Sequence, residues 1–148
     1  MSPLADISGY SRHVHSIQER FPFVTQSTLR VIPLGATLAR VEGRMECLGG
    51  IAIEVLELVD FAEHRLRSYS YEVYRRQEKV CWYDHWPHPE LPELAATFPH
   101  HRHMLPNLRD NRQPAPGMSF AQPNLDTVLA DVARDFAPTD DQPKLLNP

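Results

Sequence analysis

The sequence predicts an α+β protein: an antiparallel β-meander sheet of about five strands, flanked by an N-terminal and a C-terminal helix. Apolar residues recur at three- and four-residue steps at both ends of the chain, which is typical of amphipathic helices. Between residues 23 and 84 the pattern changes to alternation rich in β-branched residues, which is typical of consecutive antiparallel strands. Residues 87–123 then hold 8 of the 14 prolines, too many for a helix or a central strand. We therefore expect a long, stiff, irregular segment before the last helix.

The two helices are marked by their apolar stripes and by the residues that begin them. Ser2 followed by Pro3 resembles an N-cap with proline at the first helical position, and the helix ends near Pro22. Asn124 is the expected N-cap of the last helix. The stripes consist of Leu4, Ile7, Tyr10, Val14, Ile17 and Phe21 in the first helix, and of Leu125, Val128, Leu129, Val132 and Phe136 in the last. We expect one domain over residues 1–137 and a flexible tail over residues 138–148, where the sequence is polar and contains proline.

Five strands are expected from the alternating runs. They cover residues 28–32, 36–47, 51–61, 66–75 and 79–84, and a short edge strand is expected at residues 100–105. Gly49 and Gly50 form the turn of a hairpin, and residues 76–78 connect the last two runs.

Length and composition describe an ordinary globular protein of 148 residues. There is no run of 18 or more apolar residues, and no basic segment followed by an apolar stretch at the N-terminus. We therefore expect neither a membrane span nor a signal peptide, and a cytoplasmic location. Cys47 and Cys81 lack the close spacing of a metal knuckle, so we expect them to be reduced and buried.

The formal net charge of -4 argues against a general polyanion binder, but 13 of the 15 basic residues are arginine. Seven of these arginines lie between residues 65 and 112, whereas acidic residues dominate the end of the chain. The planar guanidinium fork suits bidentate contact with phosphate. The alternative is a solvated basic face offset by the many glutamates.

Five of the eight histidines lie within 19 residues: His85, His88, His100, His101 and His103. Histidine is the side chain whose ordinary pKa lies nearest neutrality, so such a cluster suits proton transfer or metal binding. The alternative is that these are loop histidines bonded to the backbone.

If residues 100–103 are extended, His101 and His103 lie on one face and His100 and Arg102 on the other. Two histidines at this spacing serve as metal ligands in many sites, with a third ligand such as His88 or Asp84 from elsewhere in the fold. The sequence therefore leaves two interpretations open. One is catalysis without any cofactor, and the other is a divalent metal on His88, His101 and His103.

Three further residues outside the histidine run are candidates. Strand alternation places Glu57 on an inward, otherwise apolar face, where a carboxylate needs a partner or a catalytic role. Tyr71 and Trp82 lie on neighbouring strands. Aromatic residues there usually pack in the core, and the alternative is a platform on which nucleic-acid bases stack.

Four segments together resemble the TumE-like toxin family. They are Tyr69-Ser70-Tyr71, Trp82-Tyr83-Asp84, Pro87-His88-Pro89-Glu90-Leu91 and Phe98-Pro99-His100-His101-Arg102-His103. The family has Y-x-Y-H, R-Y-D-N, P-H-H-P-E-L and P-H-H-x-H at the corresponding places, and the resemblance covers roughly residues 7–136. It implies a growth-inhibiting toxin with a cognate antitoxin as partner.

The sequence departs from the family pattern at three places. Glu72 stands where the family usually has histidine, His85 stands where it has asparagine, and one histidine is absent after His88. Residues 92–97 resemble an insertion. If the missing strand histidine carried the chemistry, this member would depend on another group.

The leading hypothesis is a toxin that acts on nucleic acid by metal-independent cleavage of RNA. His101 and His103 would transfer protons, with His88 in reserve, Asp84 would orient a histidine, and Arg67 or Arg102 would hold phosphate. Two other hypotheses remain: a non-enzymatic metal- or partner-binding module, and a plain β-meander whose histidines only organise the loop. Exposed sheet edges are expected to serve a homodimer or the antitoxin.

Overall fold

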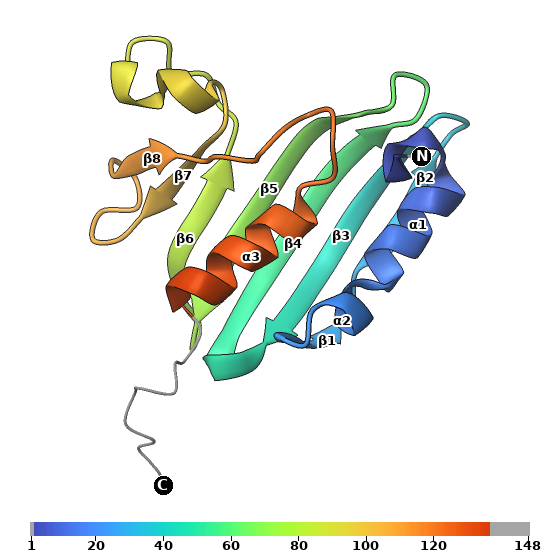
Figure 1. The fold of residues 1–148 in the computed structure, drawn as a ribbon, viewed down its shortest axis with the longest axis horizontal. Coiled ribbons are helices and arrows are strands. Elements are labelled where there is room, and N and C mark those ends of the chain that lie inside the picture. The colour runs from blue at the N-terminus through green and yellow to red at the C-terminus, as the bar shows by residue number, and fades with distance from the viewer. Residues whose placement is uncertain (1, 137–148) are drawn as a thin grey trace, which may run out of the picture.

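The alternating runs of the sequence pair into an eight-stranded antiparallel sheet in the computed structural model, which describes residues 2–136 (Figure 1). The strands are β1 (Val24–Ser27), β2 (Arg30–Leu34), β3 (Leu38–Cys47), β4 (Ile51–Asp60), β5 (Arg65–Arg75), β6 (Glu78–Asp84), β7 (His101–Met104) and β8 (Arg112–Pro114). The helices are α1 (Ile7–His15), α2 (Ile17–Arg20) and α3 (Leu125–Phe136), with short 3₁₀ turns at Pro3–Ala5, Leu48–Gly50 and Pro92–Thr97.

The sheet is a meander from β3 to β8, so each strand pairs with the next one along the chain. At the other edge, β1 and β2 both pair with β3, one beside the other. The predicted α+β class and antiparallel sheet are confirmed, but the number of five strands is wrong. The unpredicted strands are short: β1 has four residues and β8 has three, and neither shows a clean alternation.

The expected first helix is interrupted near its start. Asp6 has an extended backbone, and its Oδ1 accepts a hydrogen bond from the N–H of Gly9 at 2.7 Å, so Asp6 rather than Ser2 caps α1. Ser2 caps only the preceding 3₁₀ turn.

The last helix forms as predicted, but Asn124 does not cap it with its side chain. That side chain bonds the backbone N–H and C=O of Ser119 instead, and so closes the turn before the helix. The predicted tail over residues 138–148 lies outside the described residues.

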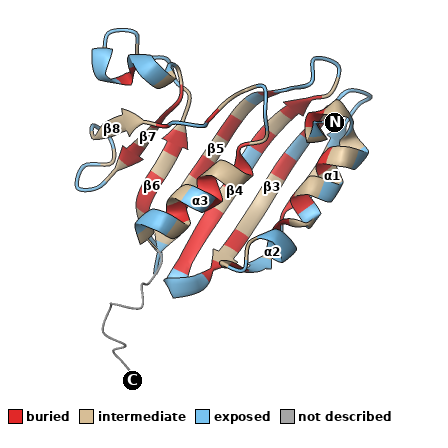
Figure 2. Cartoon of the chain, in the orientation of Figure 1, coloured by how far each residue is buried: buried red, intermediate tan, exposed pale blue. Residues whose placement is uncertain are grey.

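The helices cover one face of the sheet. Tyr10 of α1 and Asp131 of α3 both hydrogen-bond to side chains that point from the strands toward this inner face. Buried positions alternate with partly exposed ones along β4 and β5, as Figure 2 shows. The core therefore lies between the sheet and the helices. Cys47 and Cys81 are buried and free, as expected.

None of the helices in the described part of the chain is long and apolar enough to cross a membrane.

Candidate functional site

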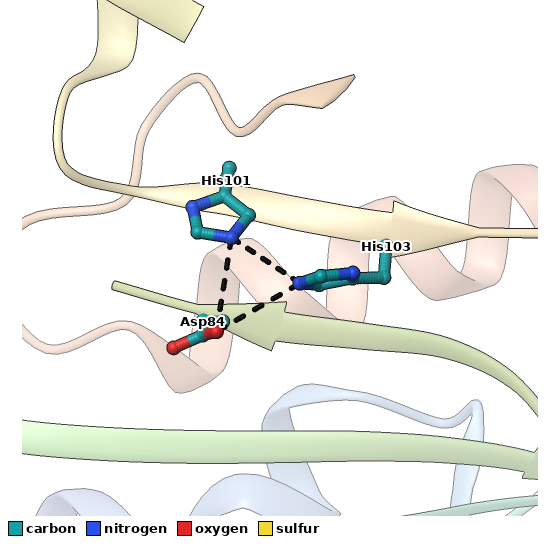
Figure 3. A group of neighbouring side chains, drawn as sticks. All are labelled: Asp84, His101 and His103. Atoms are coloured by element: carbon teal, nitrogen blue, oxygen red, sulfur yellow. Dashed lines mark hydrogen bonds and ion pairs between the residues drawn. The ribbon is translucent and has the colours of Figure 1, made fainter. Parts of the chain in front are cut away.

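Three side chains meet on the outer face of the sheet, where β6 pairs with β7 (Figure 3). Asp84 is the register partner of His101, and Trp82 is the partner of His103. Because paired residues of antiparallel strands point to the same face, Asp84, His101 and His103 converge. The Nε2 atoms of the two histidines lie 3.2 Å apart, and each lies 3.7 Å from Oδ2 of Asp84. The predicted pairing of His101 with His103 on one face is therefore confirmed.

The backbone determines which ring nitrogen of each histidine is free. Nδ1 of His101 lies 3.1 Å from the carbonyl oxygen of Pro99, and Nδ1 of His103 lies 2.5 Å from that of Leu108. A carbonyl oxygen only accepts hydrogen bonds, so each Nδ1 carries a proton and donates it. In the neutral ring, Nε2 then has a free lone pair. Both free lone pairs are thus directed to the same point as the carboxylate of Asp84.

Asp84 carries out two tasks with its two oxygens. Oδ1 accepts hydrogen bonds from the backbone N–H groups of His85 and Trp86, at 2.7 and 3.0 Å. Oδ2 faces the two histidines. Burial alone would raise the pKa of Asp84, but His103, the two N–H groups and His101 lower it to about 2. The carboxylate is therefore charged at neutral pH.

The proline-rich segment covers the histidine pair. His101 and His103 are 1% and 3% exposed, whereas the side chain of Asp84 is 22% exposed. The ring of His88 packs edge-on against His101 with 5.2 Å between centroids, and Trp82 stacks on His103 at 4.4 Å. Burial lowers the pKa of His101, which favours its neutral form. Of the three clustered side chains, Asp84 is therefore the one most open to solvent.

Two residues beside the site were not among the predicted candidates. Arg112 is the register partner of His103 on β8, and its buried Nε has no hydrogen-bond partner among the described residues. Trp86 is 68% exposed and lies two residues after Asp84. No periodicity marks either residue, because β8 has only three residues and Trp86 lies in a loop. Only nearness to the histidine run could have indicated them.

A protein-family model described as Toxin TumE matches residues 12–136 of this chain. The chain belongs to the TumE toxin family. Membership indicates the toxin component of a toxin–antitoxin system, with an antitoxin as its partner. Searches of curated proteins and of solved structures find no significant match.

Among the predicted site residues of this TumE-family toxin, Glu57 does not join the cluster. It is 1% exposed on the inner face, and its carboxylate accepts hydrogen bonds from the hydroxyls of Tyr10 and Tyr71. Burial raises its pKa, although the two tyrosines partly counteract this effect. The inward orientation is as predicted, and the partner that the carboxylate needs is a pair of tyrosines.

Three predicted nucleic-acid contacts also lie elsewhere in the TumE-family fold. Tyr71 is fully buried, so no base can stack on its ring. Arg102 points to the inner face and pairs with Asp135 of α3 at 2.8 Å, away from the histidine pair. Arg67 pairs with Asp60 at 2.6 Å. Trp82 does lie at the cluster, but one face of its ring is covered by His103.

Of the two third ligands that the sequence suggested for a metal, His88 and Asp84, the structure places Asp84 with His101 and His103. In the part of the chain that the structure describes, Asp84, His101 and His103 form the group whose donor atoms lie within 4.8 Å of one another. His88 is not in this group, and its Nδ1 lies 3.2 Å from Glu90. Glu72 stands where the TumE family usually has histidine. It is the register partner of Trp82, so it lies on the same outer face, and its carboxylate pairs with Lys79.

Proposed function

We propose that this toxin cleaves RNA, and that the reaction takes place at Asp84, His101 and His103. The observation that supports this proposal is the convergence of two Nε2 atoms, 3.2 Å apart, beside a charged carboxylate in a member of a toxin family. RNA carries its own nucleophile, the ribose 2′-hydroxyl. A pair of imidazoles is therefore enough to start and complete the cleavage of a phosphodiester.

The chemistry needs one group that accepts a proton and one that gives a proton. A neutral imidazole takes the proton of the 2′-hydroxyl while its oxygen bonds to phosphorus, and an imidazolium protonates the 5′ oxygen as its bond to phosphorus breaks. Asp84 stabilises the positive ring through its charge. Because His101 and His103 are nearly covered and Asp84 is the most exposed of the three, the phosphate would approach from the Asp84 side.

Two neighbours suit the recognition of RNA. Arg112 is the register partner of His103, and its guanidinium would offer a phosphate oxygen charged donors beside the histidine pair. Trp86 exposes a large aromatic surface two residues from Asp84, and stacking of a base on such a ring contributes about 1–3 kcal/mol. These two residues replace Arg102 and Tyr71 as the proposed contacts.

The test compares three forms of the protein: wild type, the double variant His101→Ala, His103→Ala, and the control His85→Ala. His85 is adjacent to Asp84 in sequence, but its ring packs against Tyr69 and Phe120. Growth after induced expression and the integrity of total RNA are measured, with melting temperature as a check on folding. We expect wild type and control to stop growth and fragment RNA, and the folded double variant to do neither. Intact RNA during growth arrest would contradict the proposal.

We also propose that the toxin acts in the cytoplasm, where RNA is accessible, and that a free edge of the sheet binds a second copy. The edge at β8 is three residues long and the edge at β1 and β2 is divided, so both leave backbone groups to pair. Light scattering on purified protein at several concentrations would give the oligomeric state. A monomer at all concentrations would exclude the homodimer.

A further inference from the structure

We propose that Asp84, His101 and His103 bind a divalent transition-metal cation of the zinc type, with one oxygen and two nitrogen ligands. This inference goes beyond RNA cleavage and does not depend on it. It rests on the positions of three atoms: Nε2 of His101, Nε2 of His103 and Oδ2 of Asp84.

The first argument is that no hydrogen-bond donor of residues 2–136 is found at the point where these atoms meet. Both Nδ1 protons are committed to backbone carbonyls, so neutral rings present only lone pairs there. Oδ2 of Asp84 is a third acceptor, and the N–H groups of His85 and Trp86 bond to the other oxygen. A single proton shared between the two Nε2 atoms would join only two of the three atoms. The distances of 3.7 Å from Oδ2 of Asp84 to each Nε2 atom are too long for a hydrogen bond. A cation satisfies all three at once.

The second argument is the size of the triangle. Its edges are 3.2, 3.7 and 3.7 Å, so the point equidistant from the three atoms lies about 2.1 Å from each. Zinc binds histidine nitrogen and carboxylate oxygen at roughly 2.0–2.2 Å. The ion therefore fits without movement of the strands. Three protein ligands leave a fourth position for water or for an oxygen of a bound molecule, which is the arrangement of catalytic rather than structural zinc sites.

The third argument is the support of the ligands. Histidines that bind metals commonly donate their other ring N–H to a carbonyl or carboxylate, which orients the ring and makes the ligating nitrogen more basic. Pro99 and Leu108 provide this carbonyl for His101 and His103 respectively. Imidazole nitrogen favours zinc, iron, nickel or copper, whereas calcium and magnesium prefer sites made of oxygen alone. We therefore choose Zn²⁺ as the probe.

The experiment is a calorimetric titration of Zn²⁺ into full-length protein that carries no histidine tag and has been stripped with a chelator. We expect saturable binding of one ion per chain. His101→Ala should weaken binding by more than the roughly 10- to 100-fold that loss of an outer-shell partner costs. His85→Ala should bind as the wild type does. No binding by the wild type, or equal affinity in His101→Ala, would overturn the site.

A second measurement needs only the wild type, in case the variant does not fold. Nitrogen NMR of the histidine side chains should show Nε2 of His101 and His103 shifting on addition of Zn²⁺, while His85 stays unchanged. Shifts confined to other histidines would overturn the assignment of ligands.

The two proposals fail separately. An ion at this point occupies the two lone pairs that proton transfer uses. RNA cleavage is therefore assayed with purified protein that has been treated with a chelator. RNA cleavage by protein that binds no Zn²⁺ would overturn the metal site alone. Zn²⁺ binding by protein whose chelator-treated form leaves RNA intact would overturn the proposed function alone.

Discussion

Glu57 is a carboxylate in the core: it is 1% exposed, and it accepts hydrogen bonds from the hydroxyls of two tyrosines. Glu57→Ala would leave the hydroxyls of Tyr10 and Tyr71 buried without an acceptor, so its role is to satisfy the core. That role explains a strand position that looks anomalous in the sequence, where alternation predicts an apolar residue.

The raised pKa of Glu57 predicts how stability varies with pH. Burial, which outweighs the tyrosine hydrogen bonds, raises this pKa above its ordinary 4.5 in the folded protein. The folded state therefore binds the proton more tightly than the unfolded state does. The contribution of this group to stability is greatest below pH 4.5 and is lost as pH rises through the folded pKa. Urea unfolding at a series of pH values should show this loss in the wild type and not in Glu57→Gln. Parallel curves for the two proteins would contradict it.

At the level of elements, polar contacts attach α3 to strands β6 and β7, in addition to the contacts of its apolar stripe. Arg102 of β7 pairs with Asp135 at 2.8 Å, and Tyr83 of β6 donates to Asp131 at 2.9 Å. These contacts link the inner side of β6 and β7 to the last helix, while the outer side of the same two strands carries the histidine pair. The position of the site thus depends on the docking of α3.

The Arg102 contact predicts a variant that separates stability from activity. Arg102→Met should lower the free energy of unfolding by about 2 kcal/mol, because a charged, partly buried hydrogen bond is lost, and RNA cleavage should remain. Arg134 still neutralises Asp135 in this variant. Chemical denaturation and the cleavage assay measure the two effects, with exposed Arg109→Met as the matched control. Loss of cleavage by a stable Arg102→Met protein would restore the phosphate-binding role that the sequence suggested.

The sequence predicts elements well where the pattern is long and poorly where geometry comes from contacts distant in sequence. Ten- and eleven-residue strands such as β3, β4 and β5 carry enough alternation to be recognised. The three residues of β8 do not, because that strand exists through its pairing with β7.

In the site, the spacing of His101 and His103 predicts their common face. The choice of Asp84 over His88 as the third member follows from the register of β6 with β7, which sequence spacing does not contain.

In the whole molecule, the two faces of one sheet serve different purposes. The inner face carries the core and the helices, and the outer face carries the candidate site at the β6–β7 end. A ligand of the outer site therefore stabilises the fold without changing the core. Because Zn²⁺ would bind the native state and not the unfolded chain, it should add about 2.7 kcal/mol to stability at 100 times its Kd. Thermal melts should shift upward with Zn²⁺ for the wild type and stay unchanged for His101→Ala. An equal shift in both would indicate binding elsewhere.

The two oxygens of Asp84 contact different groups, and this difference has a practical consequence for producing a toxin in cells. Oδ1 holds the turn after β6 through two backbone N–H groups, and Oδ2 alone faces the histidines. An asparagine can keep the oxygen that accepts those N–H groups while presenting an uncharged amide to the histidine pair. Cells that cannot survive production of the wild type should therefore tolerate Asp84→Asn in quantity, and the harvested protein should keep the turn after β6.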